Sequence, residues 1–585
     1  MTTPFIEALE TRIAPAAIFV NSLLGAYTDE DGDLVTVRFS KPVLTAANVA
    51  TILVTTAAGT GEHLAKIDLA GLAAASRTDI LVKTRVAGNG DGLANVGIID
   101  ATGVDLGTVI VHGDLAQILA GDAATNTRAL TSLNVHTFGV IDTIAGTAIG
   151  TSDVHGSVGA LVVTADVAGG NLSATATAAA EAGIGSVFIG GSLLGGNATL
   201  GGVVFAKGNI GTVVVRGSVI GQKTSSGFIV SDAGTIGSLR IGGSLRGGSE
   251  AQSGFVFAAS IGSVTIGRNL IGGDGDSSGQ IFAPNRIGPV VIGGGLFGGG
   301  GESSGRLTTN GTITSVTVGG SVIGGAKSPT GTIDSGVSLG PIRIGGSLIG
   351  GSASFTGGIV SAGNIGPVSI GGDIIGGGTD GTISDTGEIR SLGGSIASVR
   401  VGGDALAAFG SFNGCILADK TIGPTAIVGS VGSFGDAFFI VRAGGARTGN
   451  ALASLSVGGS VSSSLILAGY TAASASNGNA SIGPVTIGGS WSGSSIVAGV
   501  ASASVPYFGD SGDTIIAGST LASRIASITI GGYVRGTAGG TDHYGFVAQS
   551  IGSVTIAGSV IPLSTAAHTD NRLLGPTGDF RIHEV

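Results

Sequence analysis

A single phrase returns along most of this chain and constrains its fold more than any other feature. A clear early copy reads IGSVFIGGSL from Ile184, and the pattern is still legible as IGSVTIAGSV from Ile551. Counted from the leading aliphatic residue, regular copies begin at 184, 210, 236, 261, 287, 313, 339 and 365, copies with insertions at 396, 422, 452, 482, 525 and 551, and weaker copies at 106, 130 and 158. About seventeen units, spaced by 25 or 26 residues where they are regular, are typical of a solenoid.

The phrase itself indicates short strands joined by tight corners. Its fourth and sixth positions are aliphatic and the residue between them is free, as in Val187-Phe188-Ile189. This alternation predicts a strand with two side chains directed inward. Two glycines usually follow and permit the positive φ of a corner. Serine and an aliphatic residue then predict the start of a second short strand, and a Gly-x-aliphatic group before the next copy predicts a third.

Three short strands in about 26 residues are one coil of a parallel β-helix. We therefore predict an all-β, single-stranded parallel β-helix (β-solenoid) of about seventeen coils, with an N-terminal β cap and a short C-terminal cap. The expected parts are an export or sorting segment (1–25), the cap (26–104), the repeats (105–562) and the C-terminal cap (563–585). Coils stacked about 4.8 Å apart would form a rod on the order of 80 Å long.

The eleventh position of the repeat is ambiguous. It follows an apparently inward residue and yet is often aliphatic, at Ile271, Phe297, Ile323, Ile349, Ile375 and Leu406. If these side chains face out, they form an apolar stripe of the kind that marks contact sites. If the corner is tight, they point into the core. We expect the inward orientation.

Composition excludes several classes of protein. The chain has 27 basic and 37 acidic residues, a net charge of −10 and no cluster of Lys or Arg, so nucleic acid is not expected as a partner. One cysteine, Cys415, excludes an internal disulfide framework. No apolar run reaches the roughly 18 residues of a spanning helix, so no transmembrane segment is expected. Only 11% of the residues are charged, as in a chain that buries a core.

The N-terminus resembles a known export-associated segment. Residues 5–16 read FIEALETRIAPA, which is similar to the LEPR-XLL type of N-terminal segment on large, repeat-rich bacterial proteins. Thr11 stands in the place of the proline, and Ile13-Ala14-Pro15 replaces the leucine pair. As a whole the chain resembles bacterial exported β-strand-repeat proteins. That resemblance implies an extracellular or cell-surface location.

Three aspartates in the cap suggest a cation site. Asp29, Asp31 and Asp33 alternate around Gly32, and such an arrangement can supply several of the oxygen ligands that calcium needs. The twelfth residue from Asp29 is Ser40 rather than glutamate, so the helix-loop-helix calcium motif fails. Calcium is the only cofactor that the sequence suggests, and a solvated turn is the alternative.

Two further aspartates suggest a catalytic pair. Asp373 and Asp404 occupy the ninth position of successive copies, where serine is usual, and Arg400 lies on the same coil as Asp404. Stacked coils would place the two carboxylates about 5 Å apart. Paired carboxylates can act on a glycosidic bond. The alternative is that aspartate replaces serine as a turn residue.

The longest insertion, between the copies at 482 and 525, suggests a ligand-binding patch. Long loops on a regular scaffold are where function tends to be placed. The insertion and the next coil together carry the densest polar and aromatic group of the repeats, Tyr507, Asp510, Asp513, Asp542, His543 and Tyr544. Carbohydrate or another surface protein is the expected ligand. An ordered loop without a ligand is the alternative.

These observations leave three hypotheses on function. The first is a non-enzymatic extracellular or cell-surface protein, structural or adhesive, with repetitive Gly/Ser/Thr surfaces. The second is a polysaccharide lyase or hydrolase, because parallel β-helices host both enzymes and inert proteins. The third is a subunit that associates with itself into a filament or surface layer.

Overall fold

The structure, a computed structural model, describes residues 17–59, 61–88, 90–122, 127–139, 150–197, 199–379, 381–434, 437–446, 449–471, 474–539, 541–564, 566 and 568–585. Residues 1–16, which carry the LEPR-XLL-like sequence, lie outside the described residues. The predicted fold class is confirmed: the chain is nearly all β and forms a parallel β-solenoid of about 17 turns spaced about 26 residues apart. Contacts divide the chain into a first unit, 1–217 with 229–234, and a second unit, 218–228 with 235–585.

The first unit begins with a cap of antiparallel strands. They are β1 (Ile18–Asn21), β2 (Leu24–Thr28), β3 (Leu34–Phe39) and β6 (Thr78–Arg85), with a hairpin of β4 (Leu53–Ala58) and β5 (Gly61–Asp68). A helical turn, α1 (Val49–Ile52), leads into β4, and η1 (Ala73–Ala75) precedes β6. The parallel stack starts on this cap, because β5 pairs with β7 and β6 pairs with β8.

Three strand columns make the coils of the first unit. The strand of the repeated phrase forms the first column, β8 (Leu106–Val111), β10 (Arg128–Val135), β12 (Ser157–Val163), β15 (Ile184–Ile189) and β18 (Ile210–Val215). The short second column is β13 (Val167–Ala168) and β16 (Leu193–Leu194). The third is β7 (Val96–Thr102), β9 (Leu115–Gly121), β11 (Ser152–His155), β14 (Asn171–Thr175) and β17 (Val203–Ala206), and η2 (Ala179–Glu181) precedes β15.

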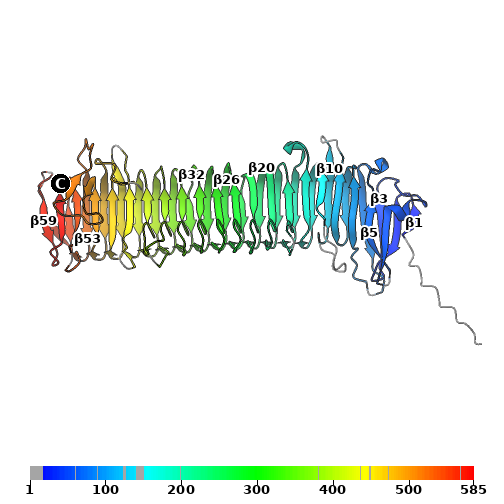
Figure 1. Cartoon of the computed structure of the whole chain (residues 1–585), viewed down its shortest axis with the longest axis horizontal. Helices are drawn as coiled ribbons and strands as arrows, with labels where there is room; N and C mark the ends of the chain where they lie inside the picture. The colour runs from blue at the N-terminus through cyan, green and yellow to red at the C-terminus, as the bar shows by residue number, and fades with distance from the viewer. Residues whose placement is uncertain are drawn as a thin grey trace, which may run out of the picture. The chain divides into compact units, whose positions relative to one another are not determined.

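The second unit repeats this plan, and its coils lie side by side in chain order (Figure 1). β20 (Phe228–Ile241) has residues in both units. The first column continues with β23 (Val264–Ile266), β26 (Arg286–Ile292), β29 (Thr312–Val318), β32 (Ser338–Leu339), β33 (Ile342–Ile344), β36 (Ile365–Ile370), β39 (Ile396–Val401), β42 (Ile422–Ile427), β45 (Asn450–Val457), β48 (Ser481–Ile487), β53 (Arg524–Ile530), β56 (Ser550–Ile551) and β57 (Val554–Ile556).

The other two columns of the second unit differ in length of strand. The second column has two or three residues a strand, in β19 (Val219–Ile220), β21 (Leu245–Arg246), β24 (Leu270–Ile271), β27 (Leu296–Phe297), β30 (Val322–Ile323), β34 (Leu348–Ile349), β37 (Ile374–Ile375), β40 (Ala405–Ala407), β43 (Val431–Ser433), β46 (Val461–Ser462), β49 (Trp491–Ser492) and β54 (Val534–Arg535). The third column is β22 (Val256–Ile261), β25 (Gln280–Ala283), β28 (Arg306–Thr309), β31 (Ile333–Ser335), β35 (Ile359–Ser361), β38 (Ile389–Ser391), β41 (Ile416–Ala418), β44 (Phe439–Ala443), β47 (Ser464–Ala468), β50 (Ser495–Ala498), β55 (Tyr544–Ala548) and β60 (Phe580–Glu584).

Inward side chains stack on their counterparts in the next coil. Val290 pairs in register with Val316, and Leu296 pairs with Val322; all four side chains are at most 1% exposed. Repetition of this register makes continuous aliphatic columns, so burial of apolar area by neighbouring coils is the main stabilising contribution. The last coils end in antiparallel strands, because β58 (Ser559–Ile561) pairs with β57 and β59 (Asn571–Leu574) pairs with β60.

The expected inward orientation of the eleventh position is wrong. In most strands of the second column the first residue is buried and the second is only half-buried, as in Leu270 and Ile271. The reason is the regular alternation of a strand, which continues through these two residues despite the nearby corner. Ile271, Phe297, Ile323, Ile349, Ile375 and Leu406 therefore form a partly exposed apolar column on the outside.

The corner before the third column is built around a buried hydroxyl. The Thr356 hydroxyl donates to the carbonyl of Ala353 (2.6 Å) and accepts the N–H of Gly351 (2.9 Å). Phe355 and Gly357 on either side have φ values of 58° and 63°. The same fully buried position recurs at Ser226, Ser253, Ser278, Ser304, Thr330 and Thr386. These side chains satisfy backbone groups that would otherwise be unpaired inside the coil.

Candidate functional site

The structure gives the predicted pair Asp373 and Asp404 a part in coil stacking. Asp373 Oδ1 accepts the N–H of Asp404 (2.8 Å), and Asp404 Oδ1 accepts the N–H of Ser430 (2.7 Å). In other coils a serine hydroxyl at the ninth position does the same, as Ser347 does for the N–H of Asp373 (3.0 Å). Arg400 is exposed on the outside of β39. The two aspartates thus replace serine in a ladder of side-chain acceptors, and a catalytic role for them stays a prediction.

The predicted ligand-binding residues of the insertion and the next coil are brought together. His543 Nε2 lies 2.8 Å from Asp510 Oδ2, although not in hydrogen-bond alignment, and the N–H of Phe508 donates to the carbonyl of His543 (3.2 Å). The ring of Tyr507 lies 5.9 Å from the rings of both His543 and Tyr544. The 541–544 segment therefore lies beside the insertion.

Asp542 and Tyr544 are linked to each other. The Tyr544 hydroxyl donates to Asp542 Oδ2 (3.0 Å), and Thr537 donates to the same oxygen. These hydrogen bonds hold the pKa of Asp542 below its usual value, with that from Thr537 as the larger cause. Burial raises the pKa of Tyr544 to about 12. Both side chains are thus engaged within the protein.

Asp513 pairs with a histidine that sequence reasoning missed. Asp513 Oδ2 accepts the N–H of Gly509 (2.7 Å) and lies 3.3 Å from Nδ1 of His583, on β60. His583 stacks in register with Val547 of β55, so it belongs to the last coil rather than to the insertion. Asp513 and His583 are 70 residues apart in the sequence, and they come together because β60 pairs in register with β55. These contacts hold the insertion on the outer face of the third column.

Beneath the insertion lies a second hydrophobic cluster, outside the coil interior. The insertion forms a hairpin of β51 (Val500–Ser502) and β52 (Asp513–Ile515), which covers outward side chains of β47, β50 and β55. The buried members are Leu465, Leu467, Tyr470, Val497, Val500, Phe508, Ile516 and Val547. Apolar residues on the outward positions of these strands therefore mark the face that carries the insertion.

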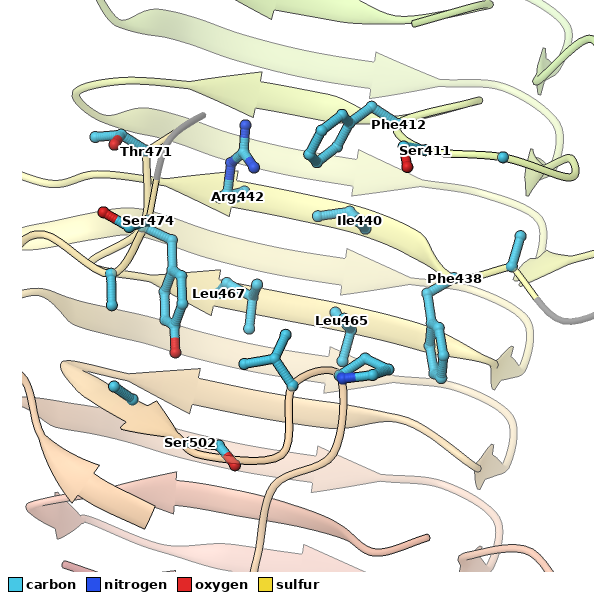
Figure 2. Close-up of a pocket in the computed structure, with 17 residues that line it drawn as sticks. Ser411, Phe412, Phe438, Ile440, Arg442, Leu465, Leu467, Thr471, Ser474 and Ser502 are labelled. Atoms are coloured by element: carbon cyan, nitrogen blue, oxygen red, sulfur yellow. The ribbon is translucent and has the colours of Figure 1, made fainter. Parts of the chain in front are cut away.

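A groove opens beside this cluster, over the outward faces of β44 and β47. We call it the β44 groove; it has a volume of about 560 Å³ and is lined mainly by Phe412, Phe438, Ile440, Arg442, Leu465, Leu467 and Tyr470 (Figure 2). Serine and threonine hydroxyls, including those of Ser411, Thr471, Ser474 and Ser502, lie at its edges. The groove combines an apolar floor with one cationic side chain.

That cationic side chain, Arg442, is buried without a counter-ion among the described residues. It is 6% exposed, and its guanidinium carbon lies 4.6 Å from the centre of the Phe412 ring, in a cation–π contact. Its neighbours in register are Leu417 and Leu467. Burial lowers the pKa of Arg442, but an arginine side chain stays protonated in proteins. A buried unpaired cation is unfavourable, so an anionic group in the groove would be stabilised strongly.

A buried carboxyl group lies directly before β38, a strand of the same column as β44. Glu388 is 1% exposed, and its Oε2 lies 3.7 Å from the guanidinium of Arg390, which also contacts Asp385. All three line a separate cavity of about 390 Å³. Burial raises the pKa of Glu388 to about 8, although the charges of Arg390 and Arg442 oppose this shift. At neutral pH the carboxyl group is therefore mostly protonated.

The raised pKa of Glu388 predicts a pH-dependent stability. In the unfolded chain the carboxyl ionises near pH 4.3, whereas in the folded protein it ionises near pH 8. Its contribution to the free energy of unfolding is therefore complete below about pH 4.3 and is lost as the pH rises to about 8. We expect Glu388→Gln to remove this loss. Urea unfolding of both proteins at about pH 5 and about pH 8.5 measures it.

The variant isolates one carboxyl group from the others. Charged groups that act on Glu388 are Arg390, Asp385, Arg442 and Asp334, and all of them remain in Glu388→Gln. An unchanged difference in stability between the two pH values in this variant would contradict the assignment.

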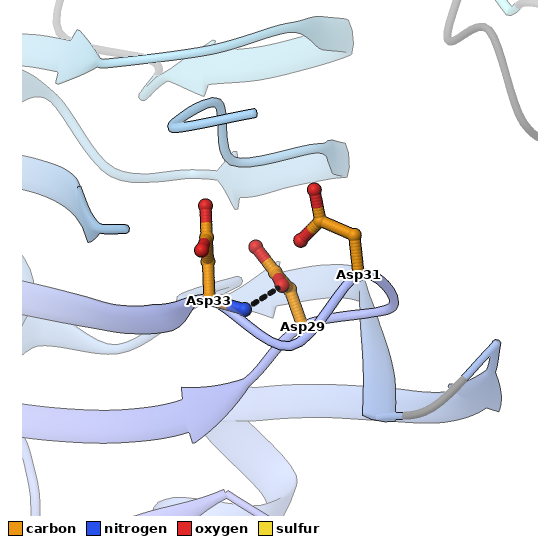
Figure 3. A group of neighbouring side chains, drawn as sticks. All are labelled: Asp29, Asp31 and Asp33. Carbon is orange, nitrogen blue, oxygen red and sulfur yellow. Dashed lines mark hydrogen bonds between the residues drawn. The ribbon is translucent and has the colours of Figure 1, made fainter. Parts of the chain in front are cut away.

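The three predicted cation ligands in the cap also come together. Oxygens of Asp29, Asp31 and Asp33 lie within 4.8 Å of one another, and their carboxylates point to the same side of the β2–β3 turn (Figure 3). The N–H of Asp33 donates to Asp29 Oδ1 (2.7 Å). Burial, and after it the hydrogen bond with Asp31, raise the pKa of Asp29 to about 7. Sequence reasoning missed His63, whose pKa is lowered by burial beside this cluster.

No helix in the described ranges has the length and hydropathy of a membrane span. Comparison of the chain with protein-family models, curated proteins and solved structures finds no match to any of them.

Proposed function

We propose that this protein is an exported, non-enzymatic β-solenoid scaffold that binds an amphipathic carboxylate in the β44 groove. The observation that carries the proposal is the Arg442 guanidinium, which lies 6% exposed in an apolar groove with no carboxylate of the described residues in ion-pair contact. An anionic head group would supply a counter-ion. The apolar floor suits an acyl or aryl body.

The surroundings of Arg442 support a carboxylate with an apolar body rather than a small inorganic anion. Ile440, Leu465 and Leu467 offer aliphatic surface along two neighbouring strands, and Phe438 and Tyr470 add aromatic rings. Contact with this surface would stabilise an apolar body by about 25 cal/mol for each Å² removed from water. Phe412 holds the guanidinium from one side, so that its hydrogen-bond donors are already ordered before a ligand arrives.

Calorimetric titration with octanoate and with octanol tests the proposal. We expect octanoate to bind the native protein more tightly than octanol, because only the acid pairs with Arg442. Arg442→Met keeps most of the apolar stem and should cost octanoate about 10–100-fold in affinity, the value of a lost charged hydrogen bond of about 1.5–3 kcal/mol. Octanol binding should not change.

Arg400→Met is the matched control, since Arg400 is an exposed arginine on a neighbouring strand column. It should bind octanoate like the native protein. Equal affinity for octanoate and octanol, or equal octanoate binding by both variants, would overturn the proposal. A groove that binds neither ligand would overturn it as well.

Export is supported by the LEPR-XLL-like residues 5–16 and by the resemblance of the repeats to exported bacterial β-strand-repeat proteins. A regular β-solenoid can support such a groove, because each coil contacts only its neighbours and loops can be added on one face. Cell fractionation with N-terminal sequencing tests this part: an uncleaved protein confined to the cytoplasm would contradict export.

A further inference from the structure

The cavity beside Glu388 gathers polar side chains from four neighbouring coils of the second unit. We call it the Glu388 cavity; it has a volume of about 390 Å³ and is lined from β28, β31, β35 and β38 and from the corners before the last three. Asp334 pairs in register with Val360, and Val360 with Arg390, so these residues stand on one outward line. A Cβ atom added at Gly358 would lie 3.6 Å from Glu388 Cγ, which places Glu388 beside this line.

Hydrogen-bonding capacity in the Glu388 cavity is fixed in place but only partly used. Arg306 Nε donates to Asp334 Oδ2 (2.6 Å), and the Thr332 hydroxyl donates to the same oxygen (2.6 Å). The terminal nitrogens of Arg306 and Oδ1 of Asp334 have no hydrogen-bond partner among the described residues. Glu388 Oε2 also lacks one, although the residue is only 1% exposed. The cavity therefore offers both donors and acceptors to a ligand.

The charges of the Glu388 cavity cancel at neutral pH. Arg306 pairs with Asp334, and Arg390 pairs with Asp385. Burial raises the pKa of Glu388 to about 8, so its carboxyl group is mostly uncharged. A charged ligand would gain little from this balance, in contrast to an anion in the β44 groove. The cavity favours an uncharged ligand whose groups both donate and accept hydrogen bonds, as hydroxyl groups do.

Phenyl rings add an apolar surface to the same face of the solenoid. Phe355 lines the cavity and is 51% exposed. Four further rings form a row with successive centres 5.5, 6.4 and 5.8 Å apart, those of Phe228, Phe255, Phe257 and Phe282. Phe282 lies in register with Thr308, and Thr308 with Asp334. The row therefore ends two coils, about 10 Å, before the polar residues of the cavity.

We propose that this face binds an uncharged linear polysaccharide, with one pyranose ring in the Glu388 cavity against Phe355 and further sugar units along the row of phenyl rings. The hydroxyl groups on the rim of a pyranose donate and accept hydrogen bonds, and the C–H groups on its flat faces pack against aromatic rings. A chain of such units matches a face on which polar groups and rings follow one another from coil to coil. This site is separate from the β44 groove.

Calorimetric titration of the full chain with cellohexaose, mannohexaose and the hexamer of glucosamine tests the proposal. We expect a neutral hexasaccharide to bind. At about pH 6 the glucosamine hexamer, which differs from cellohexaose by a charged amino group on each unit, should bind less tightly. Phe355→Ala should weaken the binding of the neutral hexasaccharide about 3–10-fold. Phe434→Ala is the matched control, because Phe434 is 52% exposed outside the cavity, and it should bind like the native protein.

Gly358→Leu is a second variant that fills the cavity and removes no polar group. The backbone at Gly358 has no positive φ, and the nearest atoms to an added Cβ lie 3.6 Å away, so a side chain fits there. It should weaken binding about 10-fold or more. Binding of neither neutral hexasaccharide, tighter binding of the glucosamine hexamer than of cellohexaose, or equal affinity in Phe355→Ala and Phe434→Ala would each overturn the proposal. Arg442→Met should bind the neutral hexasaccharide like the native protein, which separates this site from the β44 groove.

Discussion

Replacement of Trp491 by alanine will lower the free energy of unfolding of its coils by about 3–5 kcal/mol, the cost of emptying a large buried site. Trp491 takes the place of an aliphatic residue in the second column, between Val461 and Val534, and is 0% exposed. Its ring lies 5.7 Å from that of Phe546, and its indole N–H donates to the carbonyl of Ser494 (2.9 Å). The variant therefore loses packing and also leaves a carbonyl unpaired.

Tyr533→Ala is the matched control, because Tyr533 is a large aromatic residue in the next coil that is 54% exposed. It should change the stability by no more than about 0.5 kcal/mol. Hydrogen exchange resolves the two effects, since it reports on the coils around Trp491 separately from the rest of the solenoid. Equal exchange of the β48–β54 amides in both variants would contradict the prediction.

Substitution of Gly357 by alanine will destabilise the corner before β35 by at least about 2 kcal/mol, since the left-handed region alone costs an alanine about 1–2 kcal/mol. Gly357 has a φ of 63°, and a Cβ atom there would lie 1.9 Å from the carbonyl oxygen of Ile349. That oxygen belongs to the backbone and cannot move aside without shifting β34. The clash therefore adds to the backbone strain.

The neighbouring glycine gives an unusually close control. At Gly358 the nearest atoms to an added Cβ lie 3.6 Å away, an ordinary contact, and the backbone does not have a positive φ. Gly358→Ala should therefore unfold at nearly the native urea concentration, whereas Gly357→Ala unfolds earlier. Similar urea midpoints for the two variants would show that the corner can rearrange at little cost.

The regular part of this fold follows from local pattern alone. Alternation at Val187 and Ile189 predicts the strand of the phrase, because it depends only on neighbours in sequence. The glycine pairs mark the corner that follows, but the positive φ expected of them is wrong: a Cβ atom at Gly345 would instead lie 2.2 Å from the carbonyl oxygen of Gly319 in the preceding coil. The predicted inward orientation of the eleventh-position side chain was wrong because the sequence does not determine how sharply the corner beside it bends. The buried hydroxyl of Thr356 was missed since a serine or threonine in a glycine-rich stretch looks like any other loop residue.

The candidate sites were less predictable because each depends on segments that fold back over a strand. Side chains alternate along β44, and Arg442 lies at an outward position, so the sequence predicts that it is exposed. The segments that carry Phe412 and Tyr470 cover this face of the strand and bury it. Alternation along β5 likewise predicts that one of Glu62 and His63 is exposed, but both are 5% exposed because the β2–β3 turn also covers this end of the strand. The three aspartates of that turn were found because they are close in sequence.

The ladder of side-chain oxygens at the ninth position gives the stack of coils in the second unit a direction. Each of these side chains accepts an N–H of the coil that follows it, so most coils present an acceptor on one edge and a matching donor on the other. Gly295 and Tyr533 occupy the ninth position of two coils and interrupt the ladder. Five extra residues lie between Asp373 and Asp404, and yet the N–H of Asp404 still donates to Asp373 Oδ1 at 2.8 Å. Coils are therefore interchangeable modules: tandem duplication or loss of a whole coil would change the length of the solenoid and leave its edges matched.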